Sequence, residues 1–206
     1  MDRKQHWEQV YRQKPEETLS WFQPRPEISL DLIHAAGLQK TDAVIDVGGG
    51  ASRLVDQLLA EGYTDLTVLD IAEQALIAAR TRLGNSASQV HWIAADVTAW
   101  QPGRSYRLWH DRAVFHFLTD PAERAAYHRN LQAALTPGGT AVIASFTLEG
   151  PERCSGLPVQ RYSPGTLAAE LGPGFCLITH RNEAHNTPTG KVQQFQYSVF
   201  EYQNSK

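Results

Sequence analysis

The sequence has few cysteines and no cysteine-rich pattern. Its 206 residues include two, Cys154 and Cys176, and neither has a second cysteine nearby. A disulfide framework needs several cysteines at short spacings, and a structural zinc site needs paired Cys or His ligands. We therefore expect two free thiols and no metal site.

Long apolar runs and clusters of positive charge are also missing. No segment approaches the roughly 20 apolar residues that span a membrane, and residues 1–6 lack the apolar core of a signal peptide. The 19 Lys and Arg residues are scattered among 22 Asp and Glu residues, for a formal charge of -3. This excludes the basic surface typical of nucleic-acid binding. We expect a cytoplasmic protein without membrane or nucleic-acid partners, and the sequence indicates no oligomeric state.

Apolar runs and helical patterns alternate from residue 43 onward, which predicts an α/β fold. The expected architecture is a doubly wound, mostly parallel seven-stranded sheet with helices on both faces and a C-terminal antiparallel hairpin. We expect a single domain over residues 1–206, with 1–38 as a helical cap or lid and 39–206 as the core. The predicted strands are 43–47, 66–69, 90–94, 106–109, 140–146, 175–180 and 194–200, and the helices are 2–14, 26–36, 53–61, 73–83, 121–135 and 163–171.

A glycine turn, Asp46-Val47-Gly48-Gly49-Gly50, joins the first of these strands to a helix. Glycine lets the backbone approach a ligand closely, and the helix start offers unpaired N–H groups. Asp70 ends the next strand-like run, about 20 residues further on, at the spacing where a carboxylate accepts ribose hydroxyls. The third glycine of the phosphate-binding fingerprint is absent, so we expect a nucleoside rather than a pyrophosphate.

The Asp-x-Gly-x-Gly pattern resembles motif I of the class I S-adenosylmethionine-dependent methyltransferases. Residues 135–139, Leu-Thr-Pro-Gly-Gly, look like the turn before the fifth strand of that family, and the resemblance extends from about residue 40 to the end of the chain. Ser52 departs from it, because the usual residue there is glycine. The resemblance implies a Rossmann-like fold and S-adenosyl-L-methionine as the cofactor.

The same resemblance implies which residues contact the cofactor. Asp46 would orient the glycine turn or meet the ammonium group, Asp70 would hold the ribose, and the Asp96 carboxylate would receive the adenine amino group. Each aspartate could instead cap a helix or turn. The full set of implied cofactor contacts is Asp46, Gly48, Gly49, Gly50, Asp70, Ile71, Asp96, Val97 and Trp21.

The segment after the fourth strand sits where family members bracket the reacting methyl group. A general base is needed only for an acceptor that arrives protonated, and His110, Asp111 and His116 are the catalytic candidates. His116 could instead be packed among its apolar neighbours, and Asp111 could pair with Arg112. The chemistry requires no metal.

Loop 149–162 is the expected substrate-selective element. Cys154, Arg161 and Tyr162 could line the acceptor pocket, where arginine favours a carboxylate, or the last two could only anchor the loop. Aromatic residues around Trp7 could cover the cofactor or simply dock a helix.

The expected function is methyl transfer from S-adenosylmethionine to an N, O or S nucleophile of a small molecule. The N-terminal pattern resembles enzymes that methylate lysine on elongation factors, so a protein side-chain acceptor is the alternative. A non-catalytic S-adenosylmethionine-binding module is a third possibility. A nucleotide-dependent oxidoreductase is opposed by the missing glycine and by the hairpin.

Overall fold

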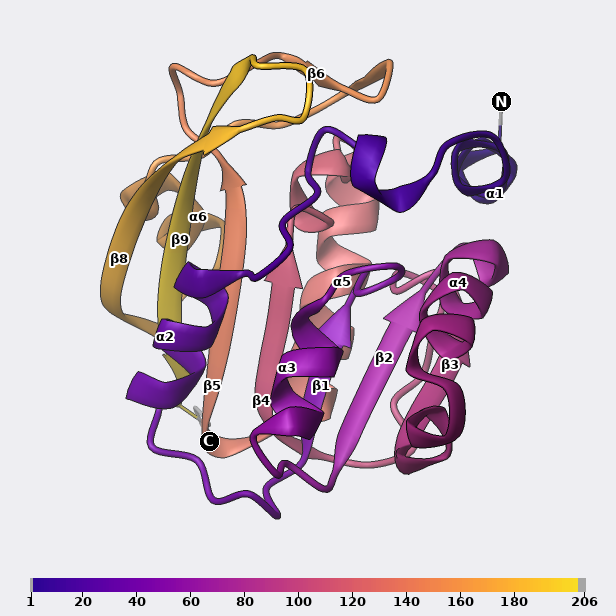
Figure 1. Ribbon diagram of the computed structural model, residues 1–206. Helices are drawn as coiled ribbons and strands as arrows, with labels where there is room; N and C mark the ends of the chain where they lie inside the picture. The colour runs from indigo at the N-terminus through magenta and orange to yellow at the C-terminus, as the bar shows by residue number, and fades with distance from the viewer. Residues whose placement is uncertain (1, 204–206) are drawn as a thin grey trace.

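The computed structural model describes residues 2–203, and within them seven strands form one sheet (Figure 1). The strand order is β3-β2-β1-β4-β5-β9-β8. The first five strands along the chain are parallel, while β9 pairs antiparallel with both β5 and β8. The strands are β1 (Val44–Val47), β2 (Leu66–Asp70), β3 (Val90–Ala94), β4 (Tyr106–Arg112), β5 (Leu135–Phe146), β8 (Phe175–Asn186) and β9 (Val192–Tyr202), and a separate short ribbon joins β6 (Arg153–Cys154) to β7 (Leu157–Pro158).

Helices cover both faces of the sheet. In Figure 1, α2, α3 and α4 lie in front of it, and α5 and α6 lie behind it. The helices are α1 (Arg3–Gln13), α2 (Glu27–Ala35), α3 (Leu54–Ala60), α4 (Glu73–Leu83), α5 (Pro121–Ala134) and α6 (Pro164–Leu171), with short 3-10 turns η1 (Glu16–Thr18), η2 (Gly84–Gln89) and η3 (Phe115–Phe117). The predicted fold class is confirmed.

The core has two layers because alternate residues of each strand point to opposite faces. On β1, Val44 packs in the layer with α2 and α3, whereas Ile45 packs in the layer with α5 and α6. All four β1 residues are buried, as expected for a central parallel strand covered on both sides. The central strands of the sheet are therefore held between two packed layers.

Local signals explain where the rear helices begin. Asp120 caps α5 by accepting the Ala122 N–H, and Pro121 occupies the first turn. Ser163 forms a capping box with Thr166 at the start of α6. Such caps satisfy N–H groups that the helix itself leaves unpaired, so the predicted starts are correct to within one residue.

Strand β4 is longer than the sequence pattern predicted. It continues past Trp109 through Arg112, because His110 pairs in register with Asp46 of β1 and Asp111 pairs with Ile143 of β5. Strands β8 and β9 also extend beyond the predicted hairpin. The extension of β4 puts two of the expected catalytic side chains inside the sheet.

The N-terminal segment crosses the end of the sheet to which the arrowheads of β2 and β4 point (Figure 1). The Glu8 carboxylate of α1 accepts the backbone N–H groups of Glu73, at 2.8 Å, and Gln74, at 3.3 Å, at the start of α4. These contacts hold α1 above the carboxyl ends of the strands. The division into a cap over 1–38 and a core over 39–206 stays a prediction. No helix within residues 2–203 has the length and apolar character to span a membrane.

Candidate functional site

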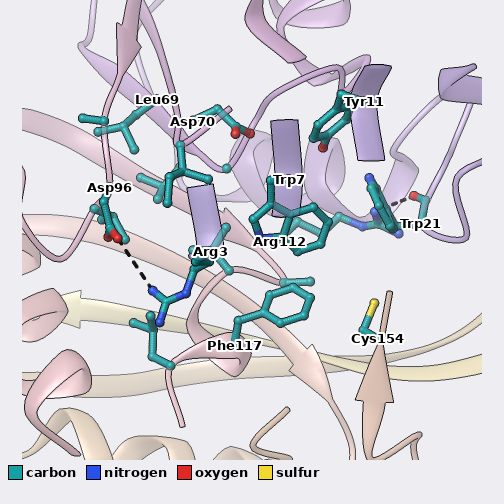
Figure 2. A pocket seen from close by; sticks show the side chains of 18 of the residues that line it. Arg3, Trp7, Tyr11, Trp21, Leu69, Asp70, Asp96, Arg112, Phe117 and Cys154 are labelled. Atoms are coloured by element: carbon teal, nitrogen blue, oxygen red, sulfur yellow. Dashed lines mark hydrogen bonds and ion pairs between the residues drawn. The ribbon is translucent and has the colours of Figure 1, made fainter. Parts of the chain in front are cut away.

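A cavity opens at the carboxyl ends of the central strands, beneath α1 (Figure 2). Its empty volume is about 790 Å³, part of which is open to solvent. Ligand-binding clefts in proteins typically have about 300–1,000 Å³. Six of the expected cofactor contacts line it: Gly48, Asp70, Ile71, Asp96, Val97 and Trp21.

The glycine turn is built where side chains have no room. Gly48 has φ +67°, and a Cβ there would overlap the Val114 side chain. A Cβ on Gly50, which has φ +37°, would lie 2.5 Å from Asp70 Oδ2. Gly48 faces the cavity, whereas Gly49 and Gly50 let the backbone pass close to the carboxylates of Asp46 and Asp70.

Asp70 ends β2 at the cavity wall. Its carboxylate is buried, and Oδ1 accepts the Ala72 N–H at 2.8 Å. Burial raises the Asp70 pKa to about 7, the Ala72 hydrogen bond opposes the shift, and the charges of Asp46 and Glu8 add to it. A buried carboxylate with acceptor capacity left at a cavity is suited to ligand hydroxyl groups.

Asp96 follows the neighbouring strand β3 and lines the cavity on the same side as Asp70. One oxygen, Oδ1, accepts the Thr98 N–H at 2.8 Å and the Thr98 hydroxyl at 2.7 Å, which is the turn-capping alternative weighed for this residue. Oδ2 lies 3.8 Å from the Arg3 guanidinium of α1. Arg3 also bonds Glu123, so it joins the start of α1 to the cavity rim. The sequence pattern gave no signal for Arg3.

Aromatic side chains from α1 and the following segment cover the cavity. The Trp7 ring packs edge-on against Trp21, with centroids 5.6 Å apart, and against Phe117, with centroids 5.1 Å apart. Tyr11 lies 6.3 Å from Trp21 by the same measure. Figure 2 shows Asp96 and Trp21 at opposite sides of the view with Trp7 between them. The aromatics thus both dock α1 and line the cavity.

Asp46 and His110 lie beneath the glycine turn and outside the cavity lining. Asp46 Oδ1 is 2.7 Å from His110 Nδ1, and His110 Nε2 is 2.9 Å from the Ser29 hydroxyl. All three side chains are buried. Asp46 thus packs under the glycine turn with Oδ1 bonded to His110, while Oδ2 is buried without a hydrogen-bond partner. Orientation of the turn, the first of its two expected roles, fits these contacts, and its contact with the cofactor stays a prediction. Both ring nitrogens of His110 have partners, which does not support a base role for it.

Asp111 and His116 are buried as well, and neither lines the cavity. Asp111 accepts the Val114 N–H at 2.7 Å and the Tyr127 hydroxyl at 2.6 Å, and it also accepts the Phe115 N–H. Burial raises the Asp111 pKa to about 6, whereas burial lowers the His116 pKa to about 3. His116 packs between Phe117 and Phe146, which is the packing alternative. The geometry does not support the expected base role of either residue.

The loop after β5 contributes one of its three candidates. Cys154 lines the cavity, and burial raises its pKa to about 11. Arg161 instead bonds the carbonyl groups of Leu148 and Gly150, and Tyr162 is buried against Phe115. Arg161 and Tyr162 therefore anchor the loop, as the alternative held, and do not contact the cavity. Both cysteines are free, and no cluster of potential metal ligands occurs among residues 2–203.

Solved structures with this fold are numerous. The N-methyltransferase NodS from Bradyrhizobium japonicum WM9, in complex with S-adenosyl-L-homocysteine, aligns over 98% of this chain and 99% of its own, with a TM-score of 0.73 and 17% identity. A chain described under "Conversion of a Disulfide Bond into a Thioacetal Group during Echinomycin Biosynthesis" aligns over 98% and 94%, with a TM-score of 0.77 and 22% identity. At these identities the likeness shows the fold.

A family model described as "Methyltransferase domain" matches residues 44–139, which contain the glycine turn, Asp70 and Asp96. The matched segment is a little under half of the chain, and the seven-stranded sheet that contains it has the fold expected for class I S-adenosylmethionine-dependent methyltransferases. The structure of NodS contains S-adenosyl-L-homocysteine, and S-adenosyl-L-methionine stays the expected cofactor of this chain.

Curated relatives share only part of their length with this chain. The "eEF1A lysine and N-terminal methyltransferase" of Bos taurus is 25% identical over 121 residues, 58% of this chain and 17% of the relative. "Trans-aconitate 2-methyltransferase" of Rhizobium leguminosarum bv. trifolii is 30% identical over 114 residues, 55% of this chain and 42% of the relative. The chain thus spans less than half the length of these relatives.

The cavity fits the expected cofactor, S-adenosyl-L-methionine. The Gly48 position is closed to any side chain, which leaves backbone at the ligand surface. Buried Asp70 offers acceptor oxygens, and Ile71 and Val97 provide apolar wall beside it. A nucleoside needs these two kinds of contact, polar for its sugar and apolar for its base.

Sequence reasoning missed Arg112, the last residue of β4. Its Nε donates to the Tyr197 hydroxyl at 2.9 Å and its Nη1 donates to the Trp21 carbonyl at 2.8 Å, while Nη2 is buried without a partner. The guanidinium lines the cavity. Strand alternation was the available signal, because adjacent residues on a strand point to opposite faces and Arg112 could not pair with Asp111.

Proposed function

We propose that this protein is a methyltransferase that transfers a methyl group from S-adenosyl-L-methionine to an N, O or S nucleophile of a small molecule, within the cavity beneath α1. The observation that carries the proposal is the enclosure of the cavity. The Gly48 turn and Asp70 form its floor, and Trp7 and Trp21 cover it. An empty volume of about 790 Å³, part of it open to solvent, suits a nucleoside cofactor with a small acceptor.

In this proposal the chain's residues bind the cofactor and orient the acceptor. The Asp70 carboxylate accepts the ribose hydroxyls, the Asp96 carboxylate accepts the adenine amino group, and Ile71 and Val97 contact the base. Gly48 allows close approach of the methionine portion. The cofactor supplies a methyl group activated by its attachment to a sulfonium. The protein's contribution is therefore alignment of the acceptor and exclusion of water by the aromatic cover.

The proposal assigns no general base. His110, Asp111 and His116 lie outside the cavity lining, and each is fully occupied or packed. The acceptor therefore enters with its lone pair free. A neutral amine, a thiolate or a carboxylate would meet this condition at neutral pH and would need no base from the chain.

Two alternatives come from the same site. A lysine side chain of a protein is one acceptor, which the name of the bovine relative supports. A non-catalytic module that only binds S-adenosylmethionine is the other. Because α1 covers the cavity, a small acceptor fits better than a lysine on a folded protein surface. The same cover favours a catalytic site over a non-catalytic binding module.

Methyl-labelled S-adenosylmethionine distinguishes these functions. The protein is incubated with label and either a mixture of small amines, thiols and carboxylic acids or a lysine-containing elongation-factor protein. We expect label in the small-molecule fraction. Label only in the protein fraction would support the lysine alternative. Tight cofactor binding with label in neither fraction would support the binding module.

A cytoplasmic location without nucleic-acid partners is part of this proposal, and no oligomeric state is assigned. Free Cys154 and Cys176 are compatible with a reducing compartment. Cell fractionation tests the location. Binding assays with labelled RNA and DNA fragments test the expected lack of nucleic-acid partners.

A further inference from the structure

Arg112 brings a positive charge to the cavity wall without an acidic partner in contact. Its two bonded groups are the Tyr197 hydroxyl and the Trp21 carbonyl, both neutral. Burial raises the Tyr197 pKa to about 12, so this hydroxyl stays protonated near neutral pH. Glu183 is reached only through Tyr197, whose hydroxyl donates to it at 2.7 Å.

Other guanidinium groups near the site are paired differently. Arg82 bonds the carboxylates of Asp56 and Glu16, and Arg3 lies against Asp96 and Glu123. Among the ion pairs of residues 2–203, none includes Arg112. Its Nη2 is buried and has no hydrogen-bond partner. A buried cationic donor is costly unless something satisfies it, which indicates an anionic ligand.

The surroundings of Arg112 are apolar. The guanidinium carbon lies 5.2 Å from the centroid of the Phe195 ring. Phe117 and Cys154 line the same cavity, and burial raises the Cys154 pKa to about 11, which leaves that thiol neutral. An anion held here would therefore meet one cation and otherwise hydrocarbon, aromatic and thiol surface. This combination fits an apolar molecule with a carboxylate.

Sheet order separates this end of the cavity from the nucleoside end. Asp70 and Asp96 follow β2 and β3, on one side of β1, whereas Arg112 ends β4 on the other side and bonds Tyr197 of β9. Figure 2 shows Arg112 and Cys154 away from Asp96. The position of Arg112 therefore favours the acceptor over the nucleoside part of the cofactor.

We propose that the free Nη2 of Arg112 binds the carboxylate of an apolar carboxylic-acid acceptor, making Arg112 the residue that selects the substrate class. The Tyr197 hydroxyl and the Trp21 carbonyl hold Nε and Nη1, which leaves Nη2 as the nitrogen of this cavity-lining residue that has no partner. This inference rests on the proposed function, because an acceptor site has meaning only beside bound cofactor. The methionine carboxylate of the cofactor is the other source of the same chemistry, and the experiment separates the two.

The test uses calorimetric titration of the whole protein with defined probes. S-adenosylhomocysteine and 5′-methylthioadenosine, which lacks the methionine carboxylate, report the cofactor site. To probe the acceptor site, the protein is saturated with S-adenosylhomocysteine and titrated with benzoate, phenylacetate or hexanoate. The affinity for each carboxylate is compared with that for the corresponding neutral amide. The variants are Arg112→Gln, Arg112→Lys and the control Arg107→Gln, which changes the same strand outside the cavity lining.

We expect the unaltered protein to bind at least one of the carboxylates at least tenfold more tightly than its amide. Arg112→Gln should lose that preference without changing affinity for S-adenosylhomocysteine, and Arg107→Gln should keep it. Arg112→Lys should retain part of it, because lysine keeps the charge but not the forked donor geometry.

Two results would overturn the inference while leaving the proposed function intact. One is equal or absent binding of every acid and amide pair by the unaltered protein, a comparison that does not depend on how the variants fold. The other is a loss of S-adenosylhomocysteine affinity in Arg112→Gln with unchanged 5′-methylthioadenosine affinity, which would assign Nη2 to the cofactor carboxylate. Failure of the unaltered protein to bind S-adenosylhomocysteine would instead remove the proposed function.

Discussion

Asp70 combines burial, a position on the cavity wall and a pKa raised to about 7, mainly by burial. Only its ionised form offers both oxygens as acceptors to the ribose hydroxyls, so cofactor binding should favour that form. Lowering the pH below the pKa protonates the group and must weaken binding. Affinity for the cofactor should therefore rise with pH until the Asp70 carboxylate is fully ionised.

We predict that affinity for S-adenosylhomocysteine falls about tenfold per pH unit below the Asp70 pKa of about 7. Titrations at about pH 6 and about pH 8 measure this, since the fold-change follows from the ionised fraction. Asp70→Asn should bind about tenfold or more weakly at the higher pH and lose the dependence. Asp65→Asn changes an exposed carboxylate paired with Arg104 and should behave as the unaltered protein. A pH-independent affinity would contradict the role of Asp70.

Asp111 was a candidate general base from the sequence, but its contacts indicate that it stabilises the fold. It receives the Val114 N–H at 2.7 Å and the Tyr127 hydroxyl at 2.6 Å inside the sheet. We predict that Asp111→Asn lowers the free energy of unfolding by about 2 kcal/mol, because the new amide N–H₂ meets donors. Urea denaturation measures the change. An unaltered unfolding curve together with lost methyl transfer would return Asp111 to the base role.

At the scale of elements, the glycine turn between β1 and α3 fixes the cavity floor. Gly48 has φ +67° and no space for a Cβ, whereas Gly62 has φ +88° and nothing within 4 Å of a Cβ. Gly62→Ala therefore carries only the backbone strain, about 1 kcal/mol. We predict that Gly48→Ala carries the same strain plus an overlap with Val114 of about 1–3 kcal/mol. Equal losses for the two variants in urea denaturation would contradict this account of the turn.

Helix α1 is held over the cavity by the Glu8 carboxylate at the start of α4. Glu8→Ala removes both contacts, so we predict faster hydrogen exchange in residues 3–13 and weaker S-adenosylhomocysteine binding. Glu17→Ala, which removes an exposed carboxylate from the same N-terminal segment, is the matched control. Unchanged exchange in the Glu8 variant would mean that the aromatic contacts of Trp7 and the pairing of Arg3 with Asp96 and Glu123 hold the helix without Glu8.

The elements were predictable where local signals are strong, and less so where pairing decides their length. Residues adjacent in sequence determine the helix caps at Asp120 and Ser163 and the glycine turn. The end of β4 does not, because His110 and Asp111 join the strand through partners in β1 and β5. That extension turned two expected cavity residues inward and brought Arg112 to the wall in their place.

For the whole molecule, strand order is what gathers the candidate site. The order β3-β2-β1-β4-β5-β9-β8 brings the carboxyl ends of β1, β2, β3 and β4 to one edge, so Gly48, Asp70, Asp96 and Arg112 line one cavity although they lie far apart in the sequence. The sequence pattern was sufficient for the fold class and for Asp70 and Asp96. It was insufficient for Arg3 and Arg112, whose positions depend on packing between distant segments.

Calorimetric titration with S-adenosylhomocysteine, with NAD as the parallel ligand, tests the central claim that this cavity is a methyltransferase cofactor site. We predict a dissociation constant in the micromolar range for S-adenosylhomocysteine and no measurable heat with NAD. Binding of NAD in place of S-adenosylhomocysteine, or binding of neither, would contradict the claim and leave the glycine turn as a structural feature only.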